Sequence, residues 1–423
     1  MFKIILKNIW SRRRINGWLT AELILITVLA WIMLDPVVEM TYDLSLEKGY
    51  DADRLCALTV KVSNDTTLEK ANDDQFYRIF DKIKRLPEVE NVTLTSFTFP
   101  ESQGNSDRVF VTNDSARIVA SVIYYLPNVN FFETFGIKSA EGYESVENLS
   151  KKSLSENQFI ITKSLADRFF PGENAIGKTL SGDSEDEKYE VVGVVEDVRP
   201  FSINRNANAV FSLTEGLQGA MMYNFDMMVK VKEGINAKDF AYKFNQNISE
   251  FKDGRTYIES AVTYDILTEN RNITPMGEYK LKVILLCFFL INLIIGVIGN
   301  FWLQTRQRAS EVAIMKSFGA TRRNIVSLLI GEGTVLTFIA WLIGCIIYLQ
   351  YALSHGLYMG FRQNLFHSIY SDIADCWVNN FSVHFLIISL IVFAVMWVFV
   401  LIGVTIPAVN ISKTNTAAAL HND

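Results

Sequence analysis

Four long runs of apolar residues dominate the pattern of the chain. They occupy residues 17–38, 279–304, 325–350 and 383–406. An α-helix needs about 20 mostly apolar residues to cross the hydrocarbon core of a bilayer, and each run reaches that length. The pattern therefore predicts four transmembrane helices.

The segment between the first two runs, residues 39–278, is far too long for a loop and predicts a folded extracytoplasmic domain. The spacing of its apolar residues alternates between the periods of strands and helices. We expect strands at 58–62, 89–95, 118–124, 158–161 and 189–195, and helices at 76–83, 163–170 and 237–251. The predicted fold class is a membrane α-helical protein with four transmembrane helices and a large mixed α/β domain inserted between helices 1 and 2.

The second transmembrane helix is longer than a bilayer requires. Residues 276–303 would form a helix of about 42 Å at 1.5 Å per residue, against a hydrocarbon core of about 30 Å. We therefore expect its outer end to form a stalk beneath the α/β domain. A tilted, ordinary span is the alternative.

Basic residues flank the runs unequally, and Lys and Arg near membrane helices stay in the cytoplasm. The residues before the first run are basic without any acidic partner: Lys3, Lys7, Arg12, Arg13 and Arg14. The segment 305–324 is also basic, with Glu311 as its one acidic residue. We therefore place both termini, the segment 305–324 and the tail 407–423 in the cytoplasm, and the loop 351–382 outside.

The N-terminal segment, residues 1–16, predicts an amphipathic helix on the inner membrane surface. Apolar residues recur at helical spacing beside basic ones: Phe2, Ile5, Leu6, Ile9 and Trp10 against Lys3, Lys7 and Arg12. A helix of this kind lies with its apolar face in the lipid, so we expect membrane lipids among the partners.

Composition excludes several classes of protein. A net charge of −6 excludes a generally basic nucleic-acid binder, and a mean hydropathy of +0.17 fits a membrane protein. Four cysteines are too few for a disulfide framework, and whether Cys56 pairs with Cys376 stays open. The histidines lack metal-ligand spacing, and no serine elbow or zinc-protease motif occurs. We expect a non-catalytic chain without a cofactor of its own.

One segment mimics a nucleotide-binding loop. Residues 172–179, GENAIGKT, fit the GxxxxGK[ST] pattern. A phosphate-binding loop needs a strand before it and a helix after it, whereas here a predicted helix precedes the motif and the acidic residues 183–187 follow it. We interpret the segment as a turn that leads into a strand.

Two carboxylates lie in or near the apolar runs, where a charge is costly and by default suggests function. Glu22 is about one turn into the first run, close enough to the interface to reach water. Glu332 stands between Gly331 and Gly333, small residues that permit close helix packing. We predict structural roles for both, with Glu332 at a dimer or helix interface. Proton transfer is the alternative.

The cytoplasmic segment 305–324 is the most informative part of the sequence. Residues 308–318 predict a short helix, Gly319 its C-terminal cap, and Thr321 the start of the next helix. A short helix between two spans suits the docking of a cytoplasmic partner. A tight helical hairpin would explain the same pattern.

This segment resembles the cytoplasmic motif of the MacB-like/FtsX-like permeases of ABC transporters, roughly R-x-R-E-x-A-I-x-K-x-x-G-A-T. The matching residues are Arg306, Arg308, Glu311, Ala313, Ile314, Lys316, Gly319, Ala320 and Thr321, with two extra residues before Glu311. Further family-like segments are residues 128–138, 174–180, 191–195, Pro407 and 418–420. Asn415-Thr416 replaces the usual Asp-Pro of the family.

The resemblance implies a half-transporter of the type VII, or mechanotransmission, class in the bacterial cytoplasmic (inner) membrane, with its large domain in the periplasm. It would dimerise with a second copy or a paralogue and bind a dimer of cytoplasmic ABC ATPases, which would hold the ATP and Mg. Arg308, Glu311, Lys316 and Gly319 would dock this ATPase. Glu332 would lie at the dimer interface.

Two functions remain open at this point. A transporter would export or extract an antimicrobial, peptide, lipid or lipoprotein, together with a periplasmic adaptor and an outer-membrane channel. An FtsX-like regulator would transport nothing and would mechanically activate a periplasmic cell-wall hydrolase. An ion-coupled carrier that uses Glu22 and Glu332 is disfavoured, because the sequence lacks the internal repeats of such carriers.

Overall fold

The computed structural model describes most of the chain. The described residues are 2–64, 67, 73–95, 98–102, 104–112, 117–126, 130–151, 154–155, 157–184, 187–205, 207–213, 225–307, 309–358 and 376–412. They divide into two compact units. The membrane unit comprises the described parts of residues 1–41, 277–359 and 376–423, and the α/β unit comprises those of residues 42–276.

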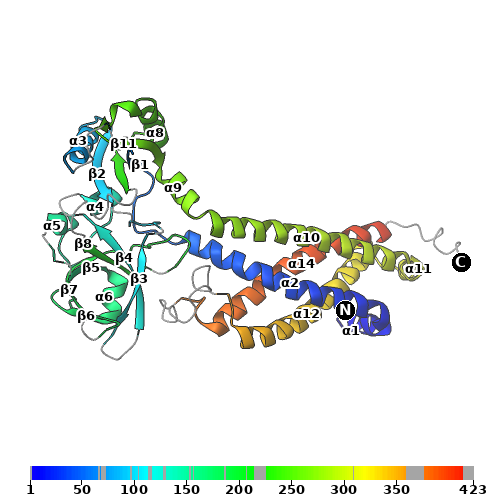
Figure 1. The fold of residues 1–423 in the computed structure, drawn as a ribbon. Helices are drawn as coiled ribbons and strands as arrows, with labels where there is room; N and C mark the ends of the chain where they lie inside the picture. Colours follow the sequence, from blue (N-terminus) through cyan, green and yellow to red (C-terminus); the bar gives the residue numbers. More distant parts are fainter. Residues whose placement is uncertain are drawn as a thin grey trace. The chain divides into compact units, whose positions relative to one another are not determined.

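The described residues of the membrane unit are mostly helical (Figure 1). Its helices are α1 (Phe2–Ser11), α2 (Arg13–Ser45), α10 (Ile273–Gln307), α11 (Ala309–Ser317), α12 (Arg322–His355) and α14 (Phe381–Ser412). As the sequence predicts, α2, α10, α12 and α14 are long and apolar enough to cross a membrane. Each is longer than its predicted span, because an apolar run marks the part suited to hydrocarbon and not the ends of the hydrogen-bonded helix.

Two helices differ from the simplest expectation. α10 is one uninterrupted helix of 35 residues, about 52 Å long at 1.5 Å per residue. The length that a stalk requires is therefore present, and the stalk itself stays a prediction. α1 is shorter than the predicted helix of residues 1–16, because it ends at Ser11 and α2 begins at Arg13.

Aromatic stacking and small residues hold the membrane unit together. Trp31 of α2 is fully buried, and its ring centroid lies 4.4 Å from that of Tyr348 and 5.0 Å from that of Phe385. A Cβ added at Gly344 would lie 2.6 Å from the Cβ of Thr27, a distance that real Cβ atoms do not reach. Glycine therefore lets α12 approach α2 closely, as small residues do in membrane helices.

In its described residues the α/β unit contains a five-stranded antiparallel sheet (Figure 1). The strand order is β10-β11-β1-β9-β2. The strands are β1 (Leu55–Val62), β2 (Val89–Thr95), β9 (Phe225–Val231), β10 (Lys252–Asp253) and β11 (Thr256–Thr263). The helices α3 (Asp73–Lys84) and α8 (Ala237–Gln246) bury Phe76, Phe240 and Phe244 in a core against this sheet.

The rest of the α/β unit is a closed barrel with the order β3-β4-β8-β5-β7-β6. Its strands are β3 (Ser106–Val111), β4 (Arg117–Tyr125), β5 (Gln158–Thr162), β6 (Thr179–Gly182), β7 (Lys188–Val195) and β8 (Ala209–Leu213). The short helices are α4 (Phe131–Phe135), α5 (Val146–Lys151), α6 (Lys163–Phe169) and α9 (Tyr264–Arg271). One core cluster contains Ala57 and Met228 of the sheet together with Ile123 and Phe211 of the barrel, so the two parts share a core.

Most of the predicted elements of this domain are confirmed, and two predictions are wrong in detail. β1 begins at Leu55, before the predicted strand of residues 58–62, and both of its faces are buried: Leu58 belongs to the core under α3 and α8, and Ala57 to the core shared with the barrel. The helix predicted over residues 237–251 ends at Gln246, because Asn247 leaves the helical conformation (φ −110°, ψ 15°). A single 3-10 turn (Ile248–Glu250) follows.

The GENAIGKT segment lies in the turn between α6 and β6. The N–H of Gly177 donates to a carbonyl of β7 (2.8 Å), and the Lys178 ammonium pairs with Glu173 and lies 5.0 Å from the centroid of the Phe170 ring. A phosphate-binding loop needs a helix after its motif, whereas the strand β6 begins at Thr179. The interpretation as a turn is confirmed.

Candidate functional site

The predicted docking segment is a short helix with a well-formed end. α11 precedes Gly319, whose φ of +90° lies in the left-handed region that favours glycine. The N–H groups of Gly319 and Ala320 donate to the carbonyls of Lys316 and Met315, both at 2.9 Å. These are the two hydrogen bonds of a Schellman motif. Thr321 then caps α12 with its side chain, so both predicted caps are confirmed.

One large apolar side chain lies at the end of α11. Phe318 is 88% exposed, directly before the glycine cap. Exposed aromatic residues are frequent anchors of protein interfaces, because they bury a large area on binding. The sequence pattern does not distinguish Phe318, since helical spacing makes it one more apolar residue of the predicted helix.

Glu311 of α11 pairs with Arg12, the residue between α1 and α2. Their side chains are 48% and 26% exposed, so solvent screens the pair and its contribution to stability is small. Arg308, also a predicted docking residue, lies outside the described residues. Glu311, Lys316 and Gly319 thus share one short element beside the N-terminal segment, and their docking role stays a prediction.

Glu332 lies on α12 and is 6% exposed. Its Oε1 accepts a hydrogen bond from Asn8 Nδ2 of α1 at 3.1 Å. A Cβ added at the neighbouring Gly331 would lie 2.7 Å from Ile5 Cδ1, so α1 packs closely on α12 here. The structure thus gives Glu332 a partner within the chain, and its predicted place in a dimer interface stays a prediction.

Glu22 of α2 faces α10. Its Oε2 accepts a hydrogen bond from Asn300 Nδ2 at 2.8 Å, and a Cβ added at Gly296 would lie 2.8 Å from its other oxygen. The carboxylate is only partly buried and has a neutral partner on a neighbouring helix. This contact fits the structural role predicted for Glu22.

A buried pair that the sequence does not predict joins α2 to α14. His384 Nε2 lies 2.7 Å from Asp35 Oδ1, and the two side chains are 0% and 1% exposed. The other ring nitrogen of His384 lies 3.0 Å from the carbonyl oxygen of Val378. The signal was present, because an ionisable residue inside an apolar run suggests a partner, but each residue stood at the edge of its run.

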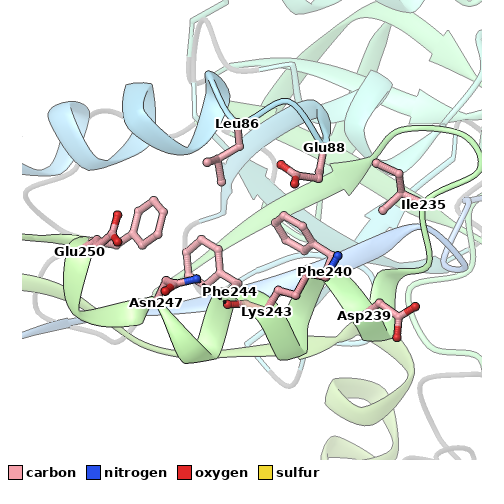
Figure 2. A pocket seen from close by; sticks show the side chains of 10 residues that line it. Leu86, Glu88, Ile235, Asp239, Phe240, Lys243, Phe244, Asn247 and Glu250 are labelled. Carbon is pink, nitrogen blue, oxygen red and sulfur yellow. Dashed lines mark hydrogen bonds between the residues drawn. The ribbon is translucent and has the colours of Figure 1, made fainter.

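A cavity of about 270 Å³ lies in the α/β unit between α8 and the end of α3. Figure 2 shows Leu86 and Glu88 across from the α8 side chains Phe240 and Phe244. The lining is apolar at Leu86, Ile235, Phe240, Phe244 and Phe251, and polar at Glu88, Asp239, Lys243, Asn247 and Glu250. This volume suits a small apolar group, such as one side chain, better than a drug-sized ligand.

Metal chemistry has no candidate site here: the part of the chain that the structure describes holds no group of three or more His, Cys, Asp or Glu residues suited to a metal ion. All four cysteines are free thiols, and Cys56 is buried. Burial raises the pKa of the Cys56 thiol to about 12, so this thiol is not a nucleophile near neutral pH.

Solved structures provide one set of comparisons. The periplasmic region of MacB from Actinobacillus actinomycetemcomitans is 13% identical with a TM-score of 0.30, and the match covers 54% of this chain and 97% of that one. A domain of a permease protein from Porphyromonas gingivalis is 18% identical, with a TM-score of 0.32 and coverage of 51% and 92%. The extracellular domain of the noncanonic ABC-type transporter YknZ from Gram-positive bacteria is 13% identical, with a TM-score of 0.28 and coverage of 48% and 100%.

Family models provide the second set. No curated protein matches the sequence significantly. Residues 19–246 match the model of the MacB-like periplasmic core domain, and residues 283–416 match the FtsX-like permease C-terminal domain. Because the first of these matches alone spans more than half of the sequence, the chain belongs to the family of MacB-like and FtsX-like permeases of ABC transporters.

Proposed function

We propose that this chain is the permease subunit of an ABC transporter and that it converts ATP hydrolysis by a separate cytoplasmic ATPase dimer into motion of its periplasmic α/β unit. This motion drives the export or extraction of an antimicrobial, peptide, lipid or lipoprotein. The chain itself catalyses no reaction and works as a dimer in the bacterial inner membrane. The adaptor and channel partners named above belong to the same proposal.

The observation that carries the proposal is the exposed Phe318 on the capped end of α11. The Schellman motif at Gly319 fixes the backbone that presents this ring, so little entropy is lost when a partner binds it. α11 is continuous in sequence with two long apolar helices, α10 and α12. Force applied to α11 by an ATPase would therefore act directly on both helices.

A charge placed at Phe318 tests the docking. We expect a tagged chain to co-purify with a nucleotide-binding subunit from its native membrane, and Phe318→Glu to lose that subunit. Phe318→Leu is the matched control, because it keeps an apolar side chain and should retain the subunit. An unchanged yield of the ATPase with Phe318→Glu would show that docking has been assigned to the wrong element.

The same purification separates transport from regulation. An adaptor or an outer-membrane channel recovered with the chain would support transport. A cell-wall hydrolase recovered in its place would support the FtsX-like regulatory role.

A further inference from the structure

A buried polar junction in the α/β unit holds the end of α2. The Arg199 side chain donates from Nη1 to the carbonyl of Leu46, just beyond the end of this helix, at 2.9 Å. Arg205 Nε lies 3.3 Å from Asp43 Oδ1, and these two side chains are 3% and 1% exposed. Two buried arginines thus bind the loop that carries them to the end of α2, Arg205 to its last turn and Arg199 to the residue just beyond it.

The same loop also binds Glu101. Glu101 donates its N–H to the carbonyl of Pro200 (2.7 Å). Its Oε1 accepts from the N–H of Ser202 (2.6 Å) and from the hydroxyl of Tyr50 (2.9 Å). Tyr50 belongs to the segment between α2 and β1, so Glu101 binds both the loop and the chain that leaves α2.

The second oxygen of Glu101 reaches the start of α10. Its Oε2 accepts from Asn272 Nδ2 at 2.9 Å. Asn272 is the C-terminal cap of α9 and directly precedes α10. One carboxylate therefore accepts hydrogen bonds from the segment that follows α2 and from the residue that precedes α10.

Glu101 is held in one conformation by its backbone and by the residues around it. Glu101 is 1% exposed and is the one non-glycine residue with a positive φ (+69°) in the described part of the chain. Such a conformation persists where surrounding contacts enforce it, and it is frequent at functional positions. Burial raises the pKa of Tyr50 and of Tyr264, so both phenols stay protonated and donate hydrogen bonds, Tyr264 to Pro100 O.

We propose that Glu101 is a positioning residue that locks the end of α2 and the start of α10 to each other, so that the two helices move the α/β unit as one body. This inference rests on the proposed function, because it identifies where motion of the helices enters the periplasmic unit. Glu101 acts here through Asn272, Tyr50 and Ser202.

An exchange of amide and carboxylate tests the lock. Asn272→Asp sets a second buried carboxylate against Glu101, which should repel it and lower the melting temperature by about 6–20 °C. Adding Glu101→Gln to Asn272→Asp restores the hydrogen bond with donor and acceptor exchanged, while the new amide oxygen still accepts from Tyr50 and Ser202. Glu133→Gln is the matched control, since the Glu133 carboxylate accepts a hydrogen bond from Ser150 in the same unit.

The readout is a distance within the α/β unit of the full chain, reconstituted in lipid nanodiscs together with its ATPase. Spin labels at the exposed positions Lys238 of α8 and Thr274 of α10 report how firmly α10 is held. Cys287 and Cys376, which would also take up the label, are first replaced by alanine. Electron-spin distance measurements are made without nucleotide and with ATP, and ATP hydrolysis is measured in the same samples.

Because the proposed dimer would add distances between protomers, the labelled chain is diluted with unlabelled chain. We then expect one narrow Lys238–Thr274 distance distribution in the wild type, in Glu133→Gln and in the double variant, with and without ATP. Asn272→Asp should broaden the distribution while the ATPase stays bound and active. A narrow distribution in Asn272→Asp, or a double variant as broad as this single variant, would overturn the assignment. If Asn272→Asp does not fold, recovery of folding in the double variant decides the same question. If no ATPase binds to the wild type, the proposed function fails, and the nucleotide-free distances still test Glu101.

Discussion

Gly49 offers a sharp test of how closely the α/β unit packs around the chain that leaves α2. The residue lies between α2 and β1 with φ = +78°. A Cβ added there would lie 1.8 Å from the carbonyl oxygen of Asp197 and 3.0 Å from the Cα of Val198. Both neighbours are backbone atoms, so Gly49→Ala cannot be accommodated by a side-chain rotation.

The expected cost has two parts. A left-handed conformation costs a non-glycine residue about 1–2 kcal/mol. Relief of the overlap with Asp197 requires a backbone shift, which costs about 1–3 kcal/mol in overpacked interiors. We therefore expect Gly49→Ala to lower the free energy of unfolding by about 2–5 kcal/mol. Gly142 has φ = +83° with no atom within 4 Å of the added Cβ. Gly142→Ala should therefore lower the free energy of unfolding only by the cost of the left-handed conformation, about 1–2 kcal/mol.

Differential scanning calorimetry of the full chain in detergent micelles measures this difference. For a unit of this size, 1 kcal/mol corresponds to about 2–4 °C in the melting temperature. We expect the melting temperature of the α/β transition to fall by about 4–20 °C in Gly49→Ala and by about 2–8 °C in Gly142→Ala. If Gly142→Ala is at least as destabilising as Gly49→Ala, the close approach to Asp197 does not add to the loss of stability, and the packing argument for Gly49 is refuted.

Three further predictions concern buried groups. Burial raises the pKa of Cys56 from 9.0 to about 12, so above about pH 9 the unfolded chain ionises this thiol while the folded chain does not, and stability falls as pH rises through this range. At about pH 9, maleimide should modify Cys56 only after unfolding, and mass spectrometry of folded and unfolded samples checks this. Asp35→Ala removes the buried hydrogen-bond partner of His384 Nε2 and should lower the free energy of unfolding by about 1–3 kcal/mol, measured by thermal unfolding. Asp35→Leu with His384→Leu should recover most of the loss, and a double variant less stable than Asp35→Ala would contradict the pairing. Gly344→Val would place a branched side chain against α2, and it should lower the melting temperature of the membrane unit; an unchanged value would show that α2 and α12 separate freely.

The sequence was most informative where the structure depends on local signals. Apolar runs identify the four long helices, because the requirement for about 20 apolar residues is a property of the segment alone. The end of α11 was predictable for the same reason, since a glycine in the left-handed conformation and a threonine N-cap act within one or two turns. The turn that imitates a nucleotide-binding loop was recognised from its immediate neighbours.

The apolar pattern of the sequence did not predict the strand β9, which contains buried charged residues. β9 contains Asp226 and Lys230, 7% and 6% exposed, and these residues interrupt the apolar pattern that marks a buried strand. Their partners are distant in sequence: Asp226 accepts from Thr59 at 2.9 Å, and Lys230 lies 3.4 Å from Asp51. A buried charge is stable only when the fold brings a partner to it. Because that partner is distant in sequence, the local pattern of residues does not reveal the pair.

The partners of Glu311 and Glu101 could not be predicted either, because they too are distant in sequence. Arg12 and Glu311 are separated by 299 positions, and Glu101 and Asn272 by 171. Spacing along the chain places Glu311 on a short helix but says nothing of its partner. Glu101 follows a proline in a short turn without any motif, and only its positive φ and its three donors distinguish it from a surface glutamate.

α10 connects the two positions on which the proposed mechanism depends. It begins directly after Asn272, the partner of Glu101, and ends at Gln307, with one residue between it and the start of α11. Pro275 lies in its first turn, where no intrahelical N–H is required, so the helical hydrogen bonds continue from there to Gln307. α2 contains Pro36 in its interior, which removes one of its hydrogen bonds. α10 therefore lacks the internal break in hydrogen bonding that Pro36 makes in α2, and the proposed lock at Glu101 would make α2 follow α10.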